Sequence, residues 1–469
     1  MASVHSSPFA GQWYPGEAEG LERLLEEAFE RSRQRTGPFL FPNGLGFIVP
    51  HAGPAYSGTV AAAVYRSLAE EWPEHVVVLG FPHRGGLSGV ALPDVDCVAT
   101  PLGEVRLARE FAAGFAVVDE ERVCDHSFEI QLPFLQKSAP GALVTALYVG
   151  SMSAAERASA ADRLAAAWRP GVVFVASSDF THYGRGFGYV PFPPEDAAGG
   201  RLRELDGECI EAAGSVNARI FLKELNERRA TVCGSDPIAL LLETLRRLEG
   251  EGLYQSKLDY QTSGEITGDF RHSVSYAALG YYPRAAFDLD EADREALLDS
   301  ARETLGRLRE TGQREAVPAR NGSAALTARR GAFVTLRQGS ELLGCIGNTS
   351  GRGPVAKDVA ELALSAALDD PRFRPAAKTK GPVDIEISLL TPLRRIADRH
   401  GFCAGRHGAL LKLAGHTGLL LPQVADEHGW NAEQFLNALA RKSRLGPEAL
   451  DNPRARLYRF EAQVFGRAG

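Results

Sequence analysis

The 469-residue chain has few cysteines and lacks several features that define whole protein classes. Its six cysteines are scattered without a CxxC pair, which is too sparse for a disulfide framework and unlike a structural zinc site. No apolar run reaches the roughly 18 residues of a membrane span. Residues 1–14 do not resemble a signal peptide, because no positive start precedes an apolar core. These absences predict a cytoplasmic protein with mostly reduced cysteines and no membrane partner.

The charge balance also excludes a class of partner. The net charge is -7, so the chain has no excess of basic residues, and nucleic acid is not expected as its main ligand. With 44% hydrophobic and 24% charged residues, the composition is that of an ordinary globular protein. The length indicates about two to four domains.

Residues 1–285 show an alternation of valine-rich runs and helical patterns. Strands are predicted to end near Val49, Leu79, Val149 and Val175, and a last apolar run covers residues 273–282. Such alternation is typical of an α/β domain in which helices cover both faces of a parallel or mixed sheet.

Residues 286–469 differ in composition and are predicted to form a smaller α+β domain. A charged helical stretch at 288–311 begins it, and in 383–390 the apolar positions alternate with outward Asp384, Glu386 and Ser388. The other predicted elements are strands at 331–336 and 342–346 and helices within 348–369 and at 431–442.

Three apolar runs end at a histidine or cysteine. His51 and His83 each follow a predicted strand, and Cys233 follows Thr231-Val232. The 32-residue separation of the two histidines is the length of one βαβ unit, which predicts neighbouring strands. Ligands bind beyond the carboxyl ends of such strands, and imidazole is a ligand for iron, zinc or copper. A lone histidine that merely caps its strand is the alternative.

Cys233 precedes a predicted helix start, with Asp236 as N-cap and Pro237 at the first helical position. A thiol beside a helix N-terminus has a lowered pKa. It would then serve as metal ligand or nucleophile. A buried, inert thiol is the alternative.

Two further segments carry groups suited to proton transfer. Asp179 and His182 follow a strand, and we expect Asp179 to orient or charge-balance the imidazole, leaving the ring as a general acid or base. Asp125 and His126 open an amphipathic helix, where Asp125 is a candidate N-cap and His126 a candidate catalytic group. A plain capping role for Asp125 is an equal alternative.

The first half resembles the Memo family, whose fold is similar to that of class III extradiol dioxygenases. The resemblance implies that His51, His83 and Cys233 are metal ligands and that Asp179 and His182 lie beside them, with His182 at the position of the dioxygenase base. Cys233 in place of a carboxylate argues against ring cleavage, because two histidines and a carboxylate are the diagnostic oxygen-activating set. The matching motifs are residues 10–15, 50–53 with 56–58, 100–103, 125–127 with 131–135, 177–180 with 182–183, and 233–234.

The second half resembles the AMMECR family. The family's Leu-Arg-Gly-Cys-Ile-Gly motif has Leu343 at the arginine position here, so Arg337 or Arg406 is a candidate substitute, and Cys345 is a candidate nucleophile or a buried thiol. Memo and AMMECR proteins accompany a radical S-adenosylmethionine protein in the AmmeMemoRadiSam system, which implies such a partner. The matching motifs are residues 333–336, 344–347, 370–373, 387–391, 405–408 and 421–425, with Trp430 and 435–436.

Three functions are therefore open at the level of sequence. The favoured one is a metal-dependent redox or oxygenase-like enzyme, with iron or alternatively copper or zinc, acting on an unknown small molecule or modified group. A non-catalytic module that binds metal or a partner protein is the second. Hydrolysis or acyl transfer by Cys233 with His182 is the third.

Overall fold

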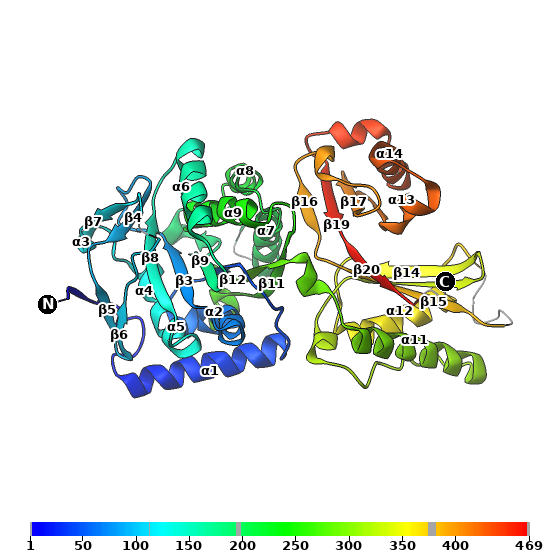
Figure 1. Ribbon diagram of the computed structural model, residues 1–469, viewed down its shortest axis with the longest axis horizontal. Coiled ribbons are helices and arrows are strands. Elements are labelled where there is room, and N and C mark those ends of the chain that lie inside the picture. Colours follow the sequence, from blue (N-terminus) through cyan, green and yellow to red (C-terminus); the bar gives the residue numbers. More distant parts are fainter. Residues whose placement is uncertain (1, 112, 194–197, 374–380, 467–469) are drawn as a thin grey trace. The chain divides into compact units, whose positions relative to one another are not determined.

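The computed structural model describes residues 2–111, 113–193, 198–373 and 381–466. It divides into two compact units, Met1–Thr36 with Leu40–Ala286 and Gly37–Phe39 with Phe287–Gly469. Figure 1 labels the elements of both units. Among the described residues, no helix combines the length and the apolar character needed to cross a membrane.

The first unit is built on a mixed sheet whose central strands are parallel. In spatial order they are β2 (Gly46–Val49), β9 (Val172–Ser177), β3 (His75–Gly80) and β8 (Leu143–Val149). The predicted strand ends are confirmed. The prediction that His51 and His83 follow neighbouring strands was wrong, because β9 lies between β2 and β3.

The remaining strands extend this sheet on both sides. β12 (His272–Pro283) runs antiparallel to β2 and pairs with β11 (Leu253–Thr262). A separate small sheet joins β1 to β5 and β6. The other strands are β1 (Val4–Ser6), β4 (Val90–Pro93), β5 (Cys97–Thr100), β6 (Gly103–Arg106), β7 (Ala116–Val118) and β10 (His182–Gly184).

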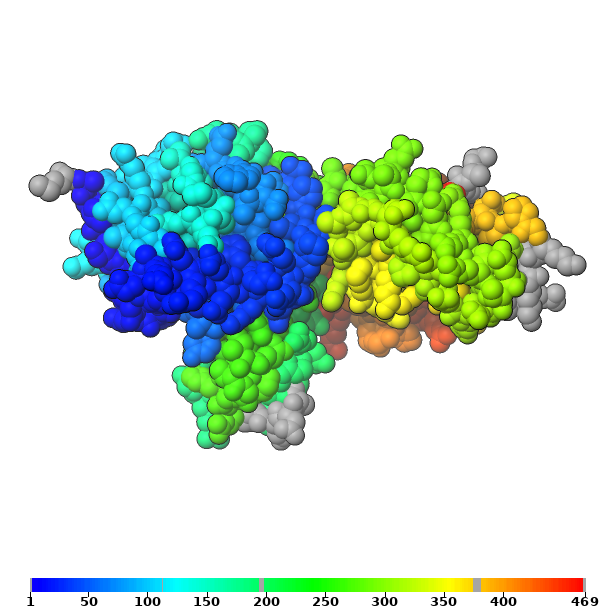
Figure 2. All heavy atoms as spheres, turned by 90° about the horizontal axis from the view of Figure 1, so that it is seen from below, coloured from blue at the N-terminus to red at the C-terminus, as the bar shows by residue number. Residues whose placement is uncertain are grey.

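Helices cover both faces of the large sheet, which confirms the predicted fold class. Figure 1 shows α1, α2 and α5 on one face and α6, α8 and α9 on the other. The outer side of α1 is exposed and appears in dark blue in Figure 2. The helices are α1 (Ala18–Thr36), α2 (Pro54–Glu71), α3 (Glu120–Val123), α4 (His126–Glu129), α5 (Gln131–Ser138), α6 (Ala154–Ala167), α7 (Ala198–Ala213), α8 (Ala218–Arg228), α9 (Ser235–Glu249) and α10 (Ser263–Thr267).

The second unit contains two antiparallel sheets, as expected for an α+β domain. The first has the order β14-β13-β15-β20 and packs on α11 and α12, and the second has the order β16-β19-β17-β18. The elements are α11 (Glu291–Thr311), β13 (Ala332–Gln338), β14 (Glu341–Asn348), α12 (Val355–Leu368), β15 (Asp384–Leu390), β16 (Arg394–Ile396), β17 (Gly408–Leu413), β18 (His416–Leu420), α13 (Gln423–His428), α14 (Ala432–Lys442), β19 (Arg456–Phe460) and β20 (Ala462–Phe465).

One detail of the β15 prediction was wrong. Glu386 and Ser388 do not face solvent but are buried. The amide of Gln423 at the start of α13 donates to both of them, at 3.1 and 3.0 Å. The polar face of this strand is therefore covered by a second layer, which the period-two pattern alone does not reveal.

Candidate functional site

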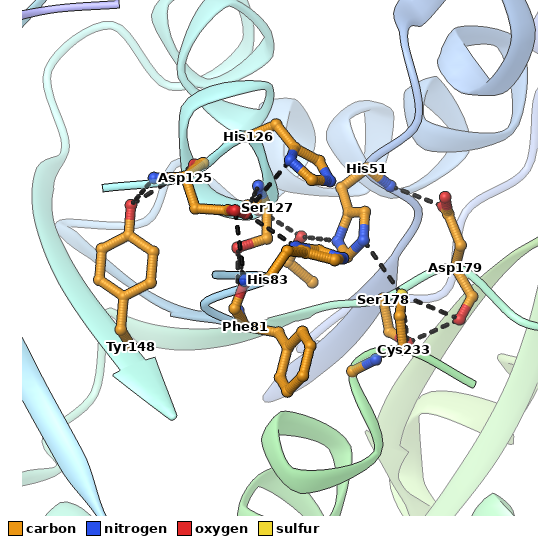
Figure 3. Close-up of polar contacts among 12 residues, drawn as sticks. His51, Phe81, His83, Asp125, His126, Ser127, Tyr148, Ser178, Asp179 and Cys233 are labelled. Carbon is orange, nitrogen blue, oxygen red and sulfur yellow. Dashed lines mark hydrogen bonds and ion pairs between the residues drawn. The ribbon is translucent and has the colours of Figure 1, made fainter. Parts of the chain in front are cut away.

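Three imidazole rings meet beyond the carboxyl ends of β2 and β3. His51 follows β2, His83 follows β3, and His126 is the first residue of α4. The ring centroids of His83 and His126 lie 4.1 Å apart, and His51 lies 5.1 and 5.2 Å from them. One ring nitrogen of each histidine lies within 4.8 Å of the others, close enough to hold one metal ion together. Figure 3 shows the cluster.

The hydrogen bonds of Ser177 determine the tautomer of His51. The Ser177 hydroxyl donates to the Ser127 carbonyl and accepts from the Gln131 amide at 3.0 Å. Its remaining lone pair faces His51 Nδ1 at 2.9 Å. Because a hydroxyl has one proton and two lone pairs, Nδ1 must be the protonated nitrogen. The Nε2 lone pair is therefore free to bind a metal, an arrangement typical of metal-binding histidines.

The carboxylate of Asp125 holds Nδ1 of His83 in the way that Ser177 holds Nδ1 of His51. Asp125 Oδ1 lies 2.9 Å from His83 Nδ1 and 3.3 Å from His126 Nδ1. The predicted N-cap is confirmed, because this oxygen also accepts from the Ser127 amide at 2.8 Å. Asp125 therefore both begins α4 and orients two of the three rings.

Cys233 contacts one ring of this cluster, that of His51, but not from a strand end as predicted. It lies in the loop between α8 and α9, and its Sγ is 3.1 Å from His51 Nε2. The predicted helix start was also wrong, because the N-cap is Gly234 rather than Asp236. A Cβ at Gly234 would lie 2.5 Å from Ser178 Cβ. Only glycine allows this loop to approach β9 so closely and bring the thiol to His51.

Burial determines the protonation of the site. It lowers the pKa of His51 well below the usual value, and it lowers the pKa of His126 to about 4 despite the attraction of Asp125. Burial and the nearby Asp179 raise the pKa of the Cys233 thiol. The predicted lowering by the α9 N-terminus was therefore wrong, because loss of solvation is the larger effect. Without a metal, burial therefore favours the neutral forms of His51, His126 and the Cys233 thiol.

The buried His126 ring should make stability depend on pH. Its folded pKa of about 4 lies below the usual 6.5, so between these values the unfolded chain binds the proton and the folded chain does not. Stability is therefore fully present above pH 6.5 and declines toward pH 4, by about 3 kcal/mol for this group. Urea unfolding in a chelator across this range should show a shallower decline for His126→Gln. The exposed His416→Gln is the control, and equal declines in all three proteins would contradict the expectation.

His182 begins β10 at the edge of this cluster. Its Nδ1 lies 3.0 Å from the Phe180 carbonyl and 3.1 Å from the Thr231 carbonyl. Nδ1 must therefore be protonated, which leaves Nε2 as a proton acceptor. Its charge would lower the pKa of His51 and His126, so it lies within electrostatic reach of both rings.

Asp179 does not orient the ring of His182, which was one of its two expected roles, but the charges of the two groups interact. Its Oδ1 accepts from the backbone amides of His51 and Ala52, at 2.9 and 3.4 Å. The ring of His182 is oriented by the two carbonyls instead. Burial raises the pKa of Asp179, although the charge of His182 opposes this. Asp179 thus fixes the loop that carries His51.

Three residues of the site were not singled out from sequence. Ser177 and Gln131 hold the tautomer of His51, and Tyr65 donates to Gln131 Oε1 at 2.6 Å. Ser177 and Gln131 lie inside the motifs 177–180 and 131–135 that resemble the Memo family, whereas the only signal for Tyr65 was a tyrosine on an otherwise apolar helix.

In the second unit, Cys345 is half buried on β14. The Thr335 hydroxyl donates to Cys345 Sγ at 3.2 Å, and the backbone amide of Cys345 donates to Asp370 at 2.9 Å. The guanidinium beside it is that of Arg372, which donates to the Cys345 carbonyl at 3.0 Å. The candidates Arg337 and Arg406 form ion pairs with glutamates of this unit, Glu427 and Glu461.

Comparison with known proteins matches both halves. Residues 6–280 match the family model described as Memo-like protein, and residues 298–465 match that described as AMMECR1. A MEMO1 family protein of Methanosarcina barkeri is 35% identical over 288 residues, covering 58% of this chain and 97% of its own. One from Methanopyrus kandleri is 32% identical over 296 residues, with coverages of 58% and 97%.

More distant similarity extends to an animal protein. The protein memo-1 homolog of Caenorhabditis elegans is 27% identical over 290 residues, covering 59% of this chain and 81% of its own. An uncharacterized protein of Pyrococcus horikoshii, known from a crystal structure, covers 38% of this chain and 91% of its own, with 31% identity and a TM-score of 0.36.

Both resemblances found in the sequence are confirmed, and the chain belongs to the Memo family and carries an AMMECR1 domain in its second half.

Proposed function

We propose that the first unit binds one transition metal ion and uses it in a redox or oxygenase-like reaction on a small molecule or modified group. His51, His83 and Cys233 would hold the ion, with His126 as a further nitrogen within reach. The proposal is carried by one observation, the unprotonated Nε2 of His51 facing both the Cys233 thiol and the other two rings. Iron is the proposed metal, and copper and zinc are the alternatives, since all three accept imidazole and thiolate.

The distances fit a metal in this place. Bonds of about 2.1 Å to nitrogen and 2.3 Å to sulfur put the two ligand atoms about 3.1 Å apart at a right angle and about 3.6 Å apart at the tetrahedral angle. His51 Nε2 and Cys233 Sγ are separated by 3.1 Å. His51, whose pKa burial lowers, need lose no proton on binding the ion, whereas the thiol of Cys233, whose pKa burial raises, must lose one. We therefore expect the affinity for metal to rise with pH.

His182 would act on protons rather than bind the ion. Its Nδ1 is held by two carbonyls, and its Nε2 is free to accept a proton from a substrate. A bound iron or copper ion would supply electron transfer or polarise a substrate atom. We further propose that a radical S-adenosylmethionine protein acts with this chain, as the family resemblance implies.

Acyl transfer is the second candidate, with His51 in place of the expected His182 as the base, because His51 Nε2 is the ring nitrogen that faces the Cys233 thiol. The Nδ1 of His51 is oriented by Ser177, which completes such an arrangement. The raised pKa of the thiol argues against a free thiolate nucleophile, whereas a bound metal ion would itself favour the thiolate of a ligand. Alkylation by iodoacetamide separates the two roles, since a bound metal protects a ligand thiol and leaves an independent nucleophile reactive.

A non-catalytic metal-binding module would keep the ion but need no proton acceptor at His182.

Cys233→Ser should weaken metal binding far more than Cys345→Ser. Cys233 alone of these two thiols lies against a histidine nitrogen, whereas Cys345 contacts a threonine hydroxyl. Anaerobic titration of iron, and aerobic titration of copper and zinc, into both variants measures the difference. Equal affinities would remove Cys233 from the ligand set.

A further inference from the structure

A second cluster of ligand groups lies at the N-terminal strand. His5 on β1 faces two carboxylates, with Nδ1 2.7 Å from Glu120 Oε2 and Nε2 3.1 Å from Glu129 Oε1. Cys124 follows α3 directly and is buried. One ligand atom each of His5, Glu120 and Cys124 lies within 4.8 Å of the others. None of these residues was singled out in the sequence.

The cluster contains a negative charge that is poorly compensated. Glu129 is 1% exposed, and its Oε2 is buried without a hydrogen-bond partner. A buried carboxylate oxygen in this state is costly unless a cation lies nearby. His5 supplies one charge in the metal-free protein, since both of its nitrogens face carboxylate oxygens and Glu129 raises its pKa. Glu120 is partly exposed, so the cluster is open to ions from solvent.

We propose that His5, Glu120 and Cys124 form a second metal site that takes a zinc-like divalent ion, separate from the three-histidine cluster. His5 Nδ1, a Glu120 oxygen and the Cys124 sulfur would be the ligands, and a water completes four-coordination. His5 Nε2–H then donates to Glu129, which gives the carboxylate–histidine–metal arrangement common in zinc proteins. The entering ion replaces one proton of the imidazolium and one of the thiol, so the charge of the cluster is unchanged.

The position of the site indicates a structural role. β1 pairs with β5, and its His5 contacts Glu120 and Glu129. An ion bound to His5 and Cys124 would strengthen this link to the segment between α3 and α4. Cys124 is followed by Asp125, the residue that orients His83 and His126. A metal bound at Cys124 would thereby steady the carboxylate on which the first cluster depends.

Zinc titration of the full chain tests this proposal. We expect two zinc ions per chain for the parent protein, and one for either Glu120→Gln or Cys124→Ser. The His51→Ala/His83→Ala protein should retain one ion, and adding Glu120→Gln to it should remove that ion. Cobalt provides a second readout, because a Cys124–cobalt bond gives a near-ultraviolet thiolate band that should persist in Cys233→Ser and disappear in the double variant Cys233→Ser/Cys124→Ser.

The matched controls lie beside the site. Cys97 is a buried cysteine paired with Val4 on β1, and Glu121 neighbours Glu120, so Cys97→Ser and Glu121→Gln should leave the second ion in place. If Cys124→Ser fails to fold, the partly exposed Glu120→Gln still decides. A parent protein that binds no ion sensitive to Glu120→Gln overturns the second site. A parent that binds a single ion, sensitive to Glu120→Gln but not to Cys233→Ser, would retain the second site and overturn the proposed function instead.

Discussion

Replacing His83 by alanine is expected to lower the affinity of the chain for its transition metal by about 10²- to 10³-fold. Structural zinc sites bind with roughly 10 to 16 kcal/mol shared among four ligands, so one ligand is worth about 2.5 to 4 kcal/mol. His83 is partly exposed, and Asp125 keeps its hydrogen bond from the Ser127 amide when the ring is removed, so the variant should fold. Competition against a chelator of known affinity measures the loss.

Two further variants make this result specific. Asp125→Asn leaves all ligands in place but weakens the hydrogen bond that orients His83, so a smaller loss of 10- to 100-fold is expected. His75→Gln is the control, because His75 is a buried histidine at the opposite end of β3, bonded to Thr145 at 2.8 Å. If His83→Ala binds metal as tightly as His75→Gln, His83 is not a ligand.

The location of the site could be predicted from the sequence because it depends on local patterns. An apolar run that ends in a polar residue indicates a buried strand and its C-terminal edge, and this rule correctly placed His51 and His83 beyond β2 and β3. The order of the strands could not be predicted in this way. Pairing of β9 between β2 and β3 depends on contacts between residues more than 90 positions apart.

The electrostatics of the site could not be predicted, because they depend on burial. A helix start after Cys233 suggested a reactive thiol, yet the close approach permitted by Gly234 buries the sulfur beside Asp179 and raises its pKa. The tautomer of His51 depends on Ser177 and Gln131, which come from β9 and α5. No short-range pattern connects these segments.

The same distinction holds in the second unit. Strand and helix positions followed from alternation and helical periodicity, whereas the partner of Cys345 did not. Arg337 and Arg406 were candidates because of their charge, but Arg372 is the residue that reaches the Cys345 carbonyl. It is held there by Asp370, at 2.7 Å from its guanidinium. A resemblance motif contained both residues, yet their contact with β14 becomes visible only in three dimensions.

Replacing His182 by glutamine is expected to preserve metal binding while lowering turnover by about 10²- to 10⁴-fold, the usual scale for a general acid or base. The two carbonyls that orient Nδ1 belong to Phe180 and Thr231. Glutamine can donate to the same carbonyls but cannot exchange a proton near neutral pH. Metal content can be measured on the purified variant at once. Turnover and its pH profile can be measured once a substrate is known. In the variant, activity should no longer show the rise with pH that comes from deprotonation of the catalytic base.

His272→Gln is the matched control for this substitution. His272 on β12 pairs with Gly184 on β10. Its ring contacts the ring of Phe187, and the ring of His182 contacts the same phenylalanine. It should therefore report any general disturbance of this sheet edge without affecting proton transfer. A His182→Gln protein that purifies without metal, while the parent and His272→Gln retain it, would place His182 among the ligands. In that case the proton acceptor must be sought elsewhere, and His126, whose pKa is held near 4 by burial, is too weak a base to replace it at neutral pH.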